Sequence, residues 1–496
     1  MERFDLLGML SYFSLQCGVH SPEALVALAA RMGASSVGIW DKGNIYGLIR
    51  GLVAARDQGI KALCGVRFDL EDGRGLLAVC LDRQGYVLLC NLLSRDVPDI
   101  LAEFVSGGWR GLALIALDRK SLARLYAARL EVSSSDLNDQ LLYAGLAFGT
   151  PYHGMRQDAN RLGVPCVACL NGGIWINQDD APLVELLQAF SRRVTLTADR
   201  QGFVLPGYGQ IPDRVQYKNA WQACPQAIEE AQALVARCQD LDLLPSSPVL
   251  PDFNRMGQRQ AFDYLLQLCV QGAERRKIDL PDINALHQAA LGNGNFEGTN
   301  IYAARLVKEL RLIISKGYVA YFLIVHDIVK QCPRTCGRGS AASSLVSYLL
   351  AITHVDPLEH DLLFDRFLHE ERQDPPDIDV DFPWDERRRV LDYVFERYKG
   401  RVGMVADHVT YAWRSSIRET ARAFGCGEMQ IGEWIAACEQ GAAEKVPPYI
   451  MGLAARLEGL PRYIGTHPGG VVITPGPINW YTTVQASAAG LPLIAW

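Results

Sequence analysis

The chain has 496 residues, of which 49% are apolar and 21% are charged, and its formal net charge is −6 at pH 7. This composition is typical of a globular protein, and the length predicts more than one domain. The net negative charge argues weakly against nucleic acid as a partner, although basic residues form local clusters. No apolar run is long enough to cross a bilayer and the first residues do not resemble a signal peptide, so we expect no membrane association. Thirteen scattered cysteines without framework spacing predict reduced thiols and a cytoplasmic location.

The first half of the chain, to about residue 250, alternates between predicted helices and strands. Ser21 is a suitable helix cap and Pro22 suits the first helical turn, so a helix is expected to begin there. The predicted elements are helices over 22–32, 45–58, 156–162 and 218–238 and strands over 36–40, 60–68, 75–81 and 165–170. Alternation of this kind predicts an α/β fold with a parallel, barrel-like or doubly wound sheet, whose strand ends are available for a site.

A segment rich in proline and serine, residues 245–252, predicts a linker to a second part of the chain. Amphipathic helices are predicted over 258–272 and over 300–316, and the second of these ends at Gly317. The run 318–329 is apolar almost throughout, which is typical of a buried core helix.

Acidic and apolar residues alternate in the stretch Pro375–Phe382. As a β-strand, this stretch would present Asp377, Asp379 and Asp381 on one face and three large apolar side chains on the other. A row of carboxylates repels itself, and Mg²⁺ binds one or two carboxylates together with water and substrate phosphates. Two such ions about 3.5–4 Å apart carry out nucleotidyl transfer. The alternative interpretation is an acidic strand on a solvated edge.

A glycine-rich segment, Cys336–Ser344, precedes an apolar stretch that we expect to be helical. Successive backbone N–H groups at such a helix start form an anion-binding nest, and the helix dipole favours a phosphate there. Arg338 adds a charge with bidentate geometry. A simple helix cap is the alternative, but a phosphate-binding loop and a carboxylate strand so close in sequence favour a shared site.

Three arginines, Arg414, Arg418 and Arg422, recur every four residues on one face of a predicted helix. Such a row is usually a solvated surface. Here it also has the spacing to follow a phosphate backbone, so both interpretations stay open.

The opening of the chain, Leu7–Ser14 followed by Ser21–Leu25, resembles the start of a PHP domain, the polymerase-and-histidinol-phosphatase family. Of the family's metal ligands that can be aligned, only Asp41 is retained. The other positions hold residues that do not bind metal or that would repel it, namely Gly8, Leu10, Lys42, Arg67, Asn171 and Gly173. A transition-metal cluster needs converging His, Asp or Glu side chains. We therefore expect no metal and no nuclease or phosphatase activity in this domain.

A second resemblance covers five segments in family order, and it is to the palm of C-family polymerases, the bacterial DNA polymerase III α subunits. The segments are 321–329, 337–342, 356–358, 362–368 and 376–382. The resemblance implies that Asp377 and Asp379 are the catalytic, metal-binding aspartates. It implies that Gly339 and Ser340 contact the triphosphate with Arg338 beside them, and it makes Arg366, on a strand-like run, a weaker phosphate-binding candidate.

The last part of the chain resembles the thumb of the same family in Tyr411–Arg418, and 465–473 resembles the strand that returns towards the palm. His467-Pro468-Gly469-Gly470 is predicted to be a tight turn before that strand. The implied fold is α/β, a degenerate PHP-like β/α barrel followed by a nucleotidyltransferase-like mixed-sheet palm and a helical thumb. The implied domains are 1–250 PHP-like, 256–408 palm, 409–486 thumb and 487–496 the start of the return to the palm.

Together these features predict a DNA-directed DNA polymerase of the replicative or repair α-subunit type. Its expected cofactor is Mg²⁺ in a two-metal palm site, and its expected partners are primer–template DNA, deoxynucleoside triphosphates and other replication or repair proteins. In the family, a strand with a third aspartate and then the fingers would follow Trp496. The alternative is therefore a catalytically incompetent fragment or paralogue that binds DNA or replication proteins.

Overall fold

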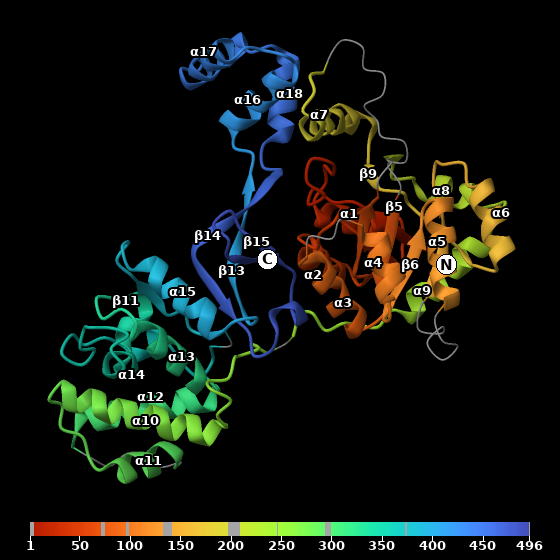
Figure 1. Ribbon diagram of the computed structural model, residues 1–496. Coiled ribbons are helices and arrows are strands. Elements are labelled where there is room, and N and C mark those ends of the chain that lie inside the picture. Colours follow the sequence, from red (N-terminus) through yellow and green to blue (C-terminus); the bar gives the residue numbers. More distant parts are fainter. Residues whose placement is uncertain are drawn as a thin grey trace. The chain divides into compact units, whose positions relative to one another are not determined.

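The computed structural model describes residues 4–70, 75–95, 99–131, 141–196, 209–245, 247–292, 299–372 and 374–495. The chain divides into two compact units (Figure 1). The first unit comprises 1–243, 404–470 and 479–496, and the second comprises 244–403 and 471–478. All thirteen cysteines carry free thiols.

Two five-stranded sheets form the centre of the first unit, with strand orders β10-β9-β1-β2-β3 and β4-β5-β6-β7-β8. The strands are β1 Asp5–Met9, β2 Ser36–Ile39, β3 Lys61–Ala62, β4 Gly65–Asp69, β5 Gly75–Cys80, β6 Leu112–Ala116, β7 Leu141–Ala147, β8 Cys166–Cys169, β9 Gly173–Trp175 and β10 Gly209–Gln210. Pairing is parallel except for β5, which is antiparallel to β4 and β6.

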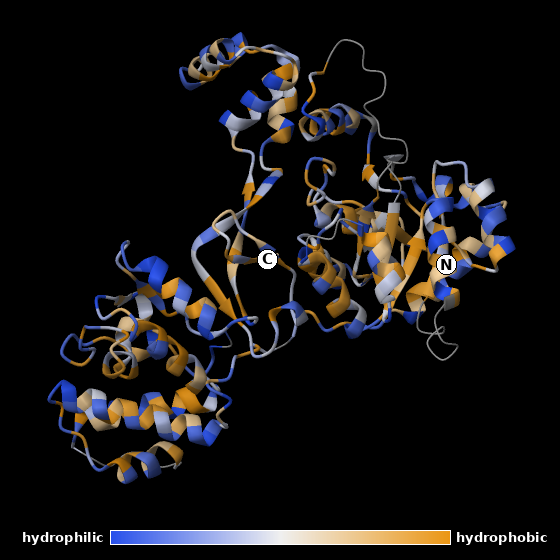
Figure 2. Ribbon diagram, in the orientation of Figure 1, coloured by the Kyte–Doolittle hydropathy of each residue, from blue (hydrophilic) through white to orange (hydrophobic). Residues whose placement is uncertain are grey.

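Hydrogen bonds at two seams join these sheets into a closed barrel. The backbone N–H of Arg67 on β4 donates to the carbonyl of Asp41 after β2 at 3.1 Å, and that of Leu170 after β8 donates to Leu7 on β1 at 2.7 Å. The ring β1-β2-β4-β5-β6-β7-β8 follows, which confirms the predicted barrel-like arrangement. Figure 2 shows β5 and β6 as largely hydrophobic, as expected for strands that are buried on both faces.

Alternate residues of the barrel strands fill its interior. A buried cluster contains Leu77 and Val79 of β5 and Ala113 and Ile115 of β6, together with Leu234 of helix α9, Gln226–Arg237. Helix α9 lies across the end at which the parallel strands begin, because Lys61 at the start of β3 donates to carbonyls near the end of α9. The opposite end of the barrel is where the parallel strands finish.

The other helices of this region are α1 Pro22–Arg31, α2 Leu48–Gln58, α3 Arg83–Leu93, α4 Ile100–Gly107, α5 Arg119–Glu131, α6 His153–Leu162, α7 Ala181–Arg192 and α8 Arg214–Ala220, with a 3₁₀ turn, η3, at Gln178–Asp180. The side chain of Ser21 accepts from the backbone N–H of Ala24, which confirms the predicted start of α1. The single helix predicted over 218–238 is wrong, because α8 ends at Ala220 and Pro225 stands directly before α9. Proline cannot donate the hydrogen bond that a helix interior requires.

A four-stranded sheet, in the order β14-β13-β16-β15, and three helices complete the first unit. Their bounds are β13 Val402–Thr410, β14 Pro461–Ile473, β15 Val484–Ala486, β16 Pro492–Ile494, α16 Trp413–Ala423, α17 Glu428–Glu439 and α18 Pro448–Leu457, with 3₁₀ turns η6 Ala443–Lys445 and η7 Ile478–Trp480. The tight turn predicted at 467–470 is wrong, because these residues continue β14. The Nδ1 atom of His467 accepts the N–H groups of Gly469 and Gly470 there, at 3.2 and 2.7 Å.

In the residues described, the second unit consists mainly of helices and one two-stranded sheet, together with the first residues of β13 and the last residues of β14. The elements are α10 Gln258–Arg275, α11 Ile283–Leu291, α12 Ile301–Ser315, α13 Val319–Val329, β11 Cys336–Arg338, α14 Leu345–Leu349, β12 Asp379–Asp381 and α15 Arg387–Arg397, with 3₁₀ turns η4 Gly339–Ser343 and η5 Phe364–Arg366. Helix α13 carries Phe322 and Leu323 into the core, which confirms the predicted core helix. Arg366 lies on a 3₁₀ turn, so the predicted strand-like run there is wrong.

In the described part of the chain, no single helix is both long and apolar enough to cross a membrane. Helices α12 and α13 pass such a test only as a pair, and the pair is bent by 111°.

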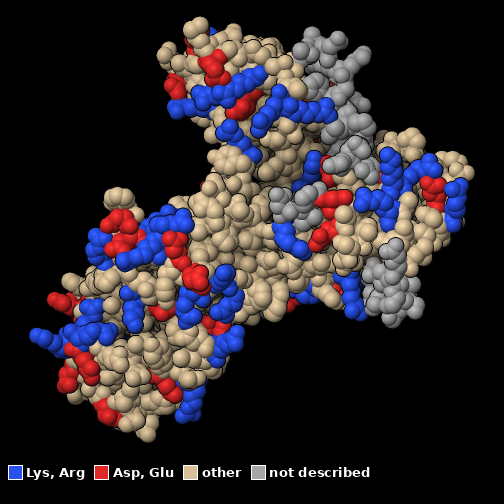
Figure 3. Space-filling model, viewed as in Figure 1, with Lys and Arg blue, Asp and Glu red and all other residues tan. Residues whose placement is uncertain are grey.

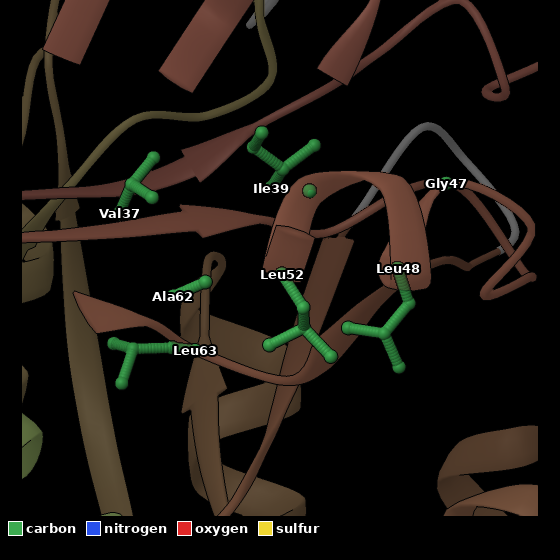
Figure 4. Close-up of a pocket in the computed structure, with 8 residues that line it drawn as sticks. Val37, Ile39, Gly47, Leu48, Leu52, Ala62 and Leu63 are labelled. Carbon is green, nitrogen blue, oxygen red and sulfur yellow. The ribbon is translucent and has the colours of Figure 1, made fainter. Parts of the chain in front are cut away.

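A small cavity beside α2 is a packing gap. It is lined by apolar groups that include Val37, Ile39, Leu52 and Leu63, and Figure 4 shows these side chains around it. Its volume is about 10 Å³. A cavity of that size has room for about one water molecule at most, so it does not qualify as a ligand site.

Candidate active site

The acidic strand pairs directly with the start of the glycine-rich segment. Strands β11 and β12 are antiparallel, and Arg338 stands opposite Asp379 while Cys336 stands opposite Asp381. The turn η4 begins at Gly339, immediately after β11. The structure therefore brings together the two segments that the sequence placed about forty residues apart.

The two faces of the acidic stretch differ as the alternation predicted. Asp377, Asp379 and Asp381 are exposed, whereas Ile378 and Val380 are half-buried and pack against the core of the second unit. Residues at alternate positions of a strand face opposite sides, so core packing on one side leaves the carboxylates in solvent on the other. Strand β12 includes only Asp379–Asp381, and Asp377 precedes it.

Two glycines allow the close approach of these segments. A Cβ atom at Gly337 would lie 2.5 Å from the backbone oxygen of Ile352, a distance that no side chain tolerates. Gly339 has φ +67°, in the left-handed region that favours glycine. A Cβ at Gly339 would lie 3.6 Å from Oδ2 of Asp379, so the turn passes within van der Waals contact of this carboxylate.

The cations beside the acidic strand are exposed. The Nε atom of Arg338 lies 3.3 Å from Oδ1 of Asp381, and the two side chains are 65% and 60% exposed. An ion pair in solvent contributes little to stability, so a ligand could displace it at small cost. The turn η5, which carries the exposed Arg366, contacts η4. Figure 3 shows Lys and Arg interspersed with Asp and Glu over the visible surface.

Tyr321 on α13 is a neighbour of the acidic strand that sequence reasoning missed. Burial raises the pKa of its hydroxyl, and a hydrogen bond with the backbone of Ile378 opposes that rise. The negative charges of Asp377 and Asp379 also raise this pKa. Tyr321 and Ile378 pack against the same apolar core. Its position in an apolar run gave no signal of this contact.

A buried ion pair on α12 occupies the helix start that the sequence assigned to phosphate. Glu309 is fully buried, and its carboxylate accepts from the N–H groups of Leu345 and Val346 at 2.9 and 3.1 Å. It also accepts from Nε of Arg305 at 2.6 Å and from the hydroxyl of Ser344 at 2.8 Å. Burial raises the pKa of Glu309, and these donors oppose the rise. The N–H groups at the start of α14 are therefore not available to a phosphate, because the chain's own carboxylate fills this position, and phosphate binding by Gly339 and Ser340 stays a prediction.

Charged side chains converge where the barrel strands end. Arg67, only 2% exposed, donates from Nε to Asp69 at 2.8 Å and from Nη1 to Asn171 at 2.5 Å. Lys42 lies 2.6 Å from Asp69. Burial raises the pKa of Asp69, but Arg67 and Lys42 lower it by more than burial raises it. The pKa of this carboxyl group is therefore below its ordinary value. Lys42, Arg67 and Asn171, at three of the aligned positions, thus belong to a network of ion pairs and hydrogen bonds with Asp69, which the sequence analysis did not name.

Asp41, the retained acidic residue, has its carboxylate occupied by hydroxyl groups. It accepts from the backbone and hydroxyl of Ser11, both at 2.8 Å, and from the hydroxyl of Ser14 at 2.7 Å. Burial raises its pKa against these hydrogen bonds. In the residues described, no group of three or more His, Cys, Asp or Glu side chains could hold a metal ion.

The backbone at the first aligned ligand position suits glycine. Gly8 has φ +91°, and a Cβ there would lie 2.3 Å from the backbone oxygen of Leu170. Leu10, at the next aligned position, is fully buried in an apolar cluster with Ile174 and Tyr411. Neither position accommodates histidine without local rearrangement.

The arginine row on α16 is largely neutralised. Arg414 lies 2.6 Å from Glu439, and Arg422 pairs with Glu419 at 3.3 Å and with Glu428 at 2.5 Å. Helices α16, α17 and α18 pack around a small apolar cluster that includes Ile417, Ile431 and Ile450. Both interpretations of the row stay open, since these partners are themselves partly exposed.

The fold and the site define a class of chain in which a PHP-type barrel precedes a polymerase-type region. The model of the PHP domain family matches residues 7–161. The model described as bacterial DNA polymerase III alpha NTPase domain matches residues 263–496. The chain therefore contains a PHP domain and a bacterial DNA polymerase III alpha NTPase domain, as the two resemblances predicted.

Curated relatives match nearly the whole chain and are named error-prone DNA polymerases. One from Nocardia farcinica is 29% identical over 98% of this chain and 48% of its own length. One from Pseudomonas fluorescens is 30% identical over 100% of this chain and 49% of its own length. The chain spans about half the length of the curated relatives that it matches. Among solved structures, an amidohydrolase from Chromobacterium violaceum covers 33% of this chain at 14% identity and a TM-score of 0.22, which supports no inference here.

Proposed function

We propose that this chain carries part of the nucleotidyl-transfer site of a DNA-directed DNA polymerase. The observation that carries the proposal is the pairing of β12 with β11, which sets Asp379 beside Gly339 and Arg338. An exposed carboxylate next to a glycine turn and an arginine is the arrangement that a metal-bound triphosphate requires. The error-prone DNA polymerases among the relatives support the same function.

In this proposal Asp377 and Asp379 hold Mg²⁺, for which exposed carboxylate oxygens are suitable ligands. When bound, Mg²⁺ would lower the pKa of the primer 3′-hydroxyl and offset the negative charge of the phosphates. The N–H groups of Gly339 and Ser340 and the side chains of Arg338 and Arg366 would bind and orient the triphosphate. Asp381 shares the acidic face, holds Arg338 by its ion pair and is not assigned as a ligand.

The partners in this proposal are primer–template DNA, deoxynucleoside triphosphates and other replication or repair proteins, in the cytoplasm. Residues 409–486 would act as the thumb that contacts the DNA backbone. The PHP-like barrel would serve as a non-hydrolytic scaffold, since cations occupy its ligand positions. The division into 1–250, 256–408, 409–486 and 487–496 stays a prediction.

Primer extension with Mg²⁺ or Mn²⁺ tests the proposal. Extension by the unaltered chain that is lost in the double variant Asp377→Asn/Asp379→Asn and retained in Asp381→Asn, which alters the same strand face, would support the proposal. Extension that survives in the double variant would show that the site lies elsewhere. Tight binding of a labelled primer–template without any extension would instead favour a catalytically incompetent chain that binds DNA.

A further inference from the structure

Arg305 connects two segments that the proposed function assigns to phosphate binding. Its Nη2 atom donates to the carbonyl of Ser343 at 2.7 Å and to that of Leu362 at 3.0 Å. Ser343 closes the turn η4, which begins at Gly339, and Leu362 lies just before η5. The guanidinium also lies 5.6 Å from the centre of the Phe364 ring, within η5. One side chain therefore contacts both the glycine turn and the turn that carries Arg366.

The pair with Glu309 fixes the orientation of this guanidinium. Nε donates to Glu309 at 2.6 Å, so Nη2 remains directed at the two carbonyls. Glu309 in turn accepts from Ser344, Leu345 and Val346, the three residues that follow η4. Arg305 is 17% exposed and Glu309 is 0% exposed, so water competes little for these hydrogen bonds.

We infer that Arg305 is a positioning residue for nucleotide binding, which holds the glycine turn and the Arg366 turn at a fixed separation through its pair with Glu309. The inference rests on the proposed function and assigns to it two residues outside the acidic strand. Arginine is suited to this role because its planar guanidinium donates from several nitrogens at once. Lysine would keep the charge beside Glu309 but would lose the fork that reaches both carbonyls.

Arg311 on the same helix supplies a matched control. It is also half-buried, and its Nε and Nη2 atoms donate to the carbonyl of Ala289 on α11 at 3.0 and 2.6 Å. Arg305→Lys and Arg311→Lys thus remove comparable guanidinium–carbonyl bonds from α12, one beside the site and one at α11. If the loss of any guanidinium from α12 has the same effect, the two variants will behave alike.

Two measurements on the full chain test the inference. The first is the equilibrium binding of dATP with Mg²⁺, for which we expect about a tenfold rise in Kd in Arg305→Lys and no change in Arg311→Lys. The second is amide hydrogen exchange, which should accelerate over 339–346 and 362–367 in Arg305→Lys only. The doubly neutral variant Arg305→Gln/Glu309→Gln, which leaves no unpaired buried charge, should show the same two changes if Arg305→Lys does not fold.

The outcomes separate this inference from the proposed function. If the unaltered chain binds no dATP, the proposed function fails. Faster exchange confined to the two segments in Arg305→Lys would still show that Arg305 holds the two turns together. Unchanged exchange in those segments overturns the inference whether or not dATP binds. Equal dATP affinity in the unaltered chain and in Arg305→Lys overturns the positioning role even where exchange has changed.

Discussion

Replacement of Arg67 by methionine measures what the cations at the barrel end contribute to stability. Methionine retains an apolar, flexible stem of similar reach but has no hydrogen-bond donor. The substitution removes the bonds from Nε to Asp69 at 2.8 Å and from Nη1 to Asn171 at 2.5 Å. It leaves Asp69 paired with Lys42 at 2.6 Å, so the carboxylate keeps a cationic partner.

The expected loss follows from those contacts. A hydrogen bond to a charged group contributes about 1.5–3 kcal/mol, and loss of one partner of a buried ion pair costs about 3–5 kcal/mol. Because Lys42 still pairs with Asp69, we expect a value near the lower limit, about 3 kcal/mol. Arg50 gives a matched comparison, since it lies 2.6 Å from Glu23 with both side chains at least 43% exposed. Such exposed pairs contribute roughly 0.2–1 kcal/mol.

The loss of stability is measured by urea titration, with hydrogen exchange in β4 and β8 as the readout. The exchange readout isolates the barrel, because a chain of two units need not unfold in a single transition. Arg67→Met should lower the midpoint for these strands by clearly more than Arg50→Met. Equal midpoints in the two variants would refute the view that a buried guanidinium supports this end of the barrel.

Three further outcomes are expected. Gly337→Ala should destabilise the second unit strongly, because its Cβ would lie 2.5 Å from the Ile352 oxygen. Gly339→Ala has its nearest contact at 3.6 Å and should cost only about 1–2 kcal/mol for its positive φ. Thermal unfolding of the two variants measures the difference. Gly8→His should lower the melting temperature and restore no Mn²⁺-dependent phosphatase activity, because its Cβ would lie 2.3 Å from the Leu170 oxygen. The folded-state pKa of Asp69 is lowered, so its stabilising contribution should be present above about pH 4 and be lost as the pH falls through the folded pKa. Unfolding curves between about pH 2 and 5 should show a weaker pH dependence of stability in Arg67→Met than in the unaltered chain.

Local sequence patterns predicted the elements that depend on local chemistry. The cap at Ser21, the core helix around Phe322 and the two faces of the acidic stretch follow from side chains within one turn or one strand. The closeness of Asp379 to the glycine turn was also expected, because only a short distance in sequence separates that turn from the carboxylate strand. The order of the motifs along the chain supported the same prediction.

Contacts between distant residues could not be predicted in this way. Glu309 fills the helix start at Leu345, and nothing in its own amphipathic helix distinguishes it from an ordinary surface glutamate. Tyr321 is one apolar residue among many until Ile378 is placed beside it. The place of Asp69 at the barrel end depends on the fold, which brings both Arg67 and Lys42 into contact with it.

The first unit has a consequence for the order in which the chain can fold during synthesis. Strand β1 completes its seam only with Leu170, and Leu10 is buried in a cluster that includes Tyr411, Ala423 and Leu457. The hydroxyl of Tyr86 donates to the carbonyl of Tyr481 as well. The apolar surface around Leu10 is therefore covered only after residues as far along the chain as Leu457 have been synthesised. A nascent chain should therefore depend on chaperones while the intervening residues 244–403 of the second unit are being synthesised.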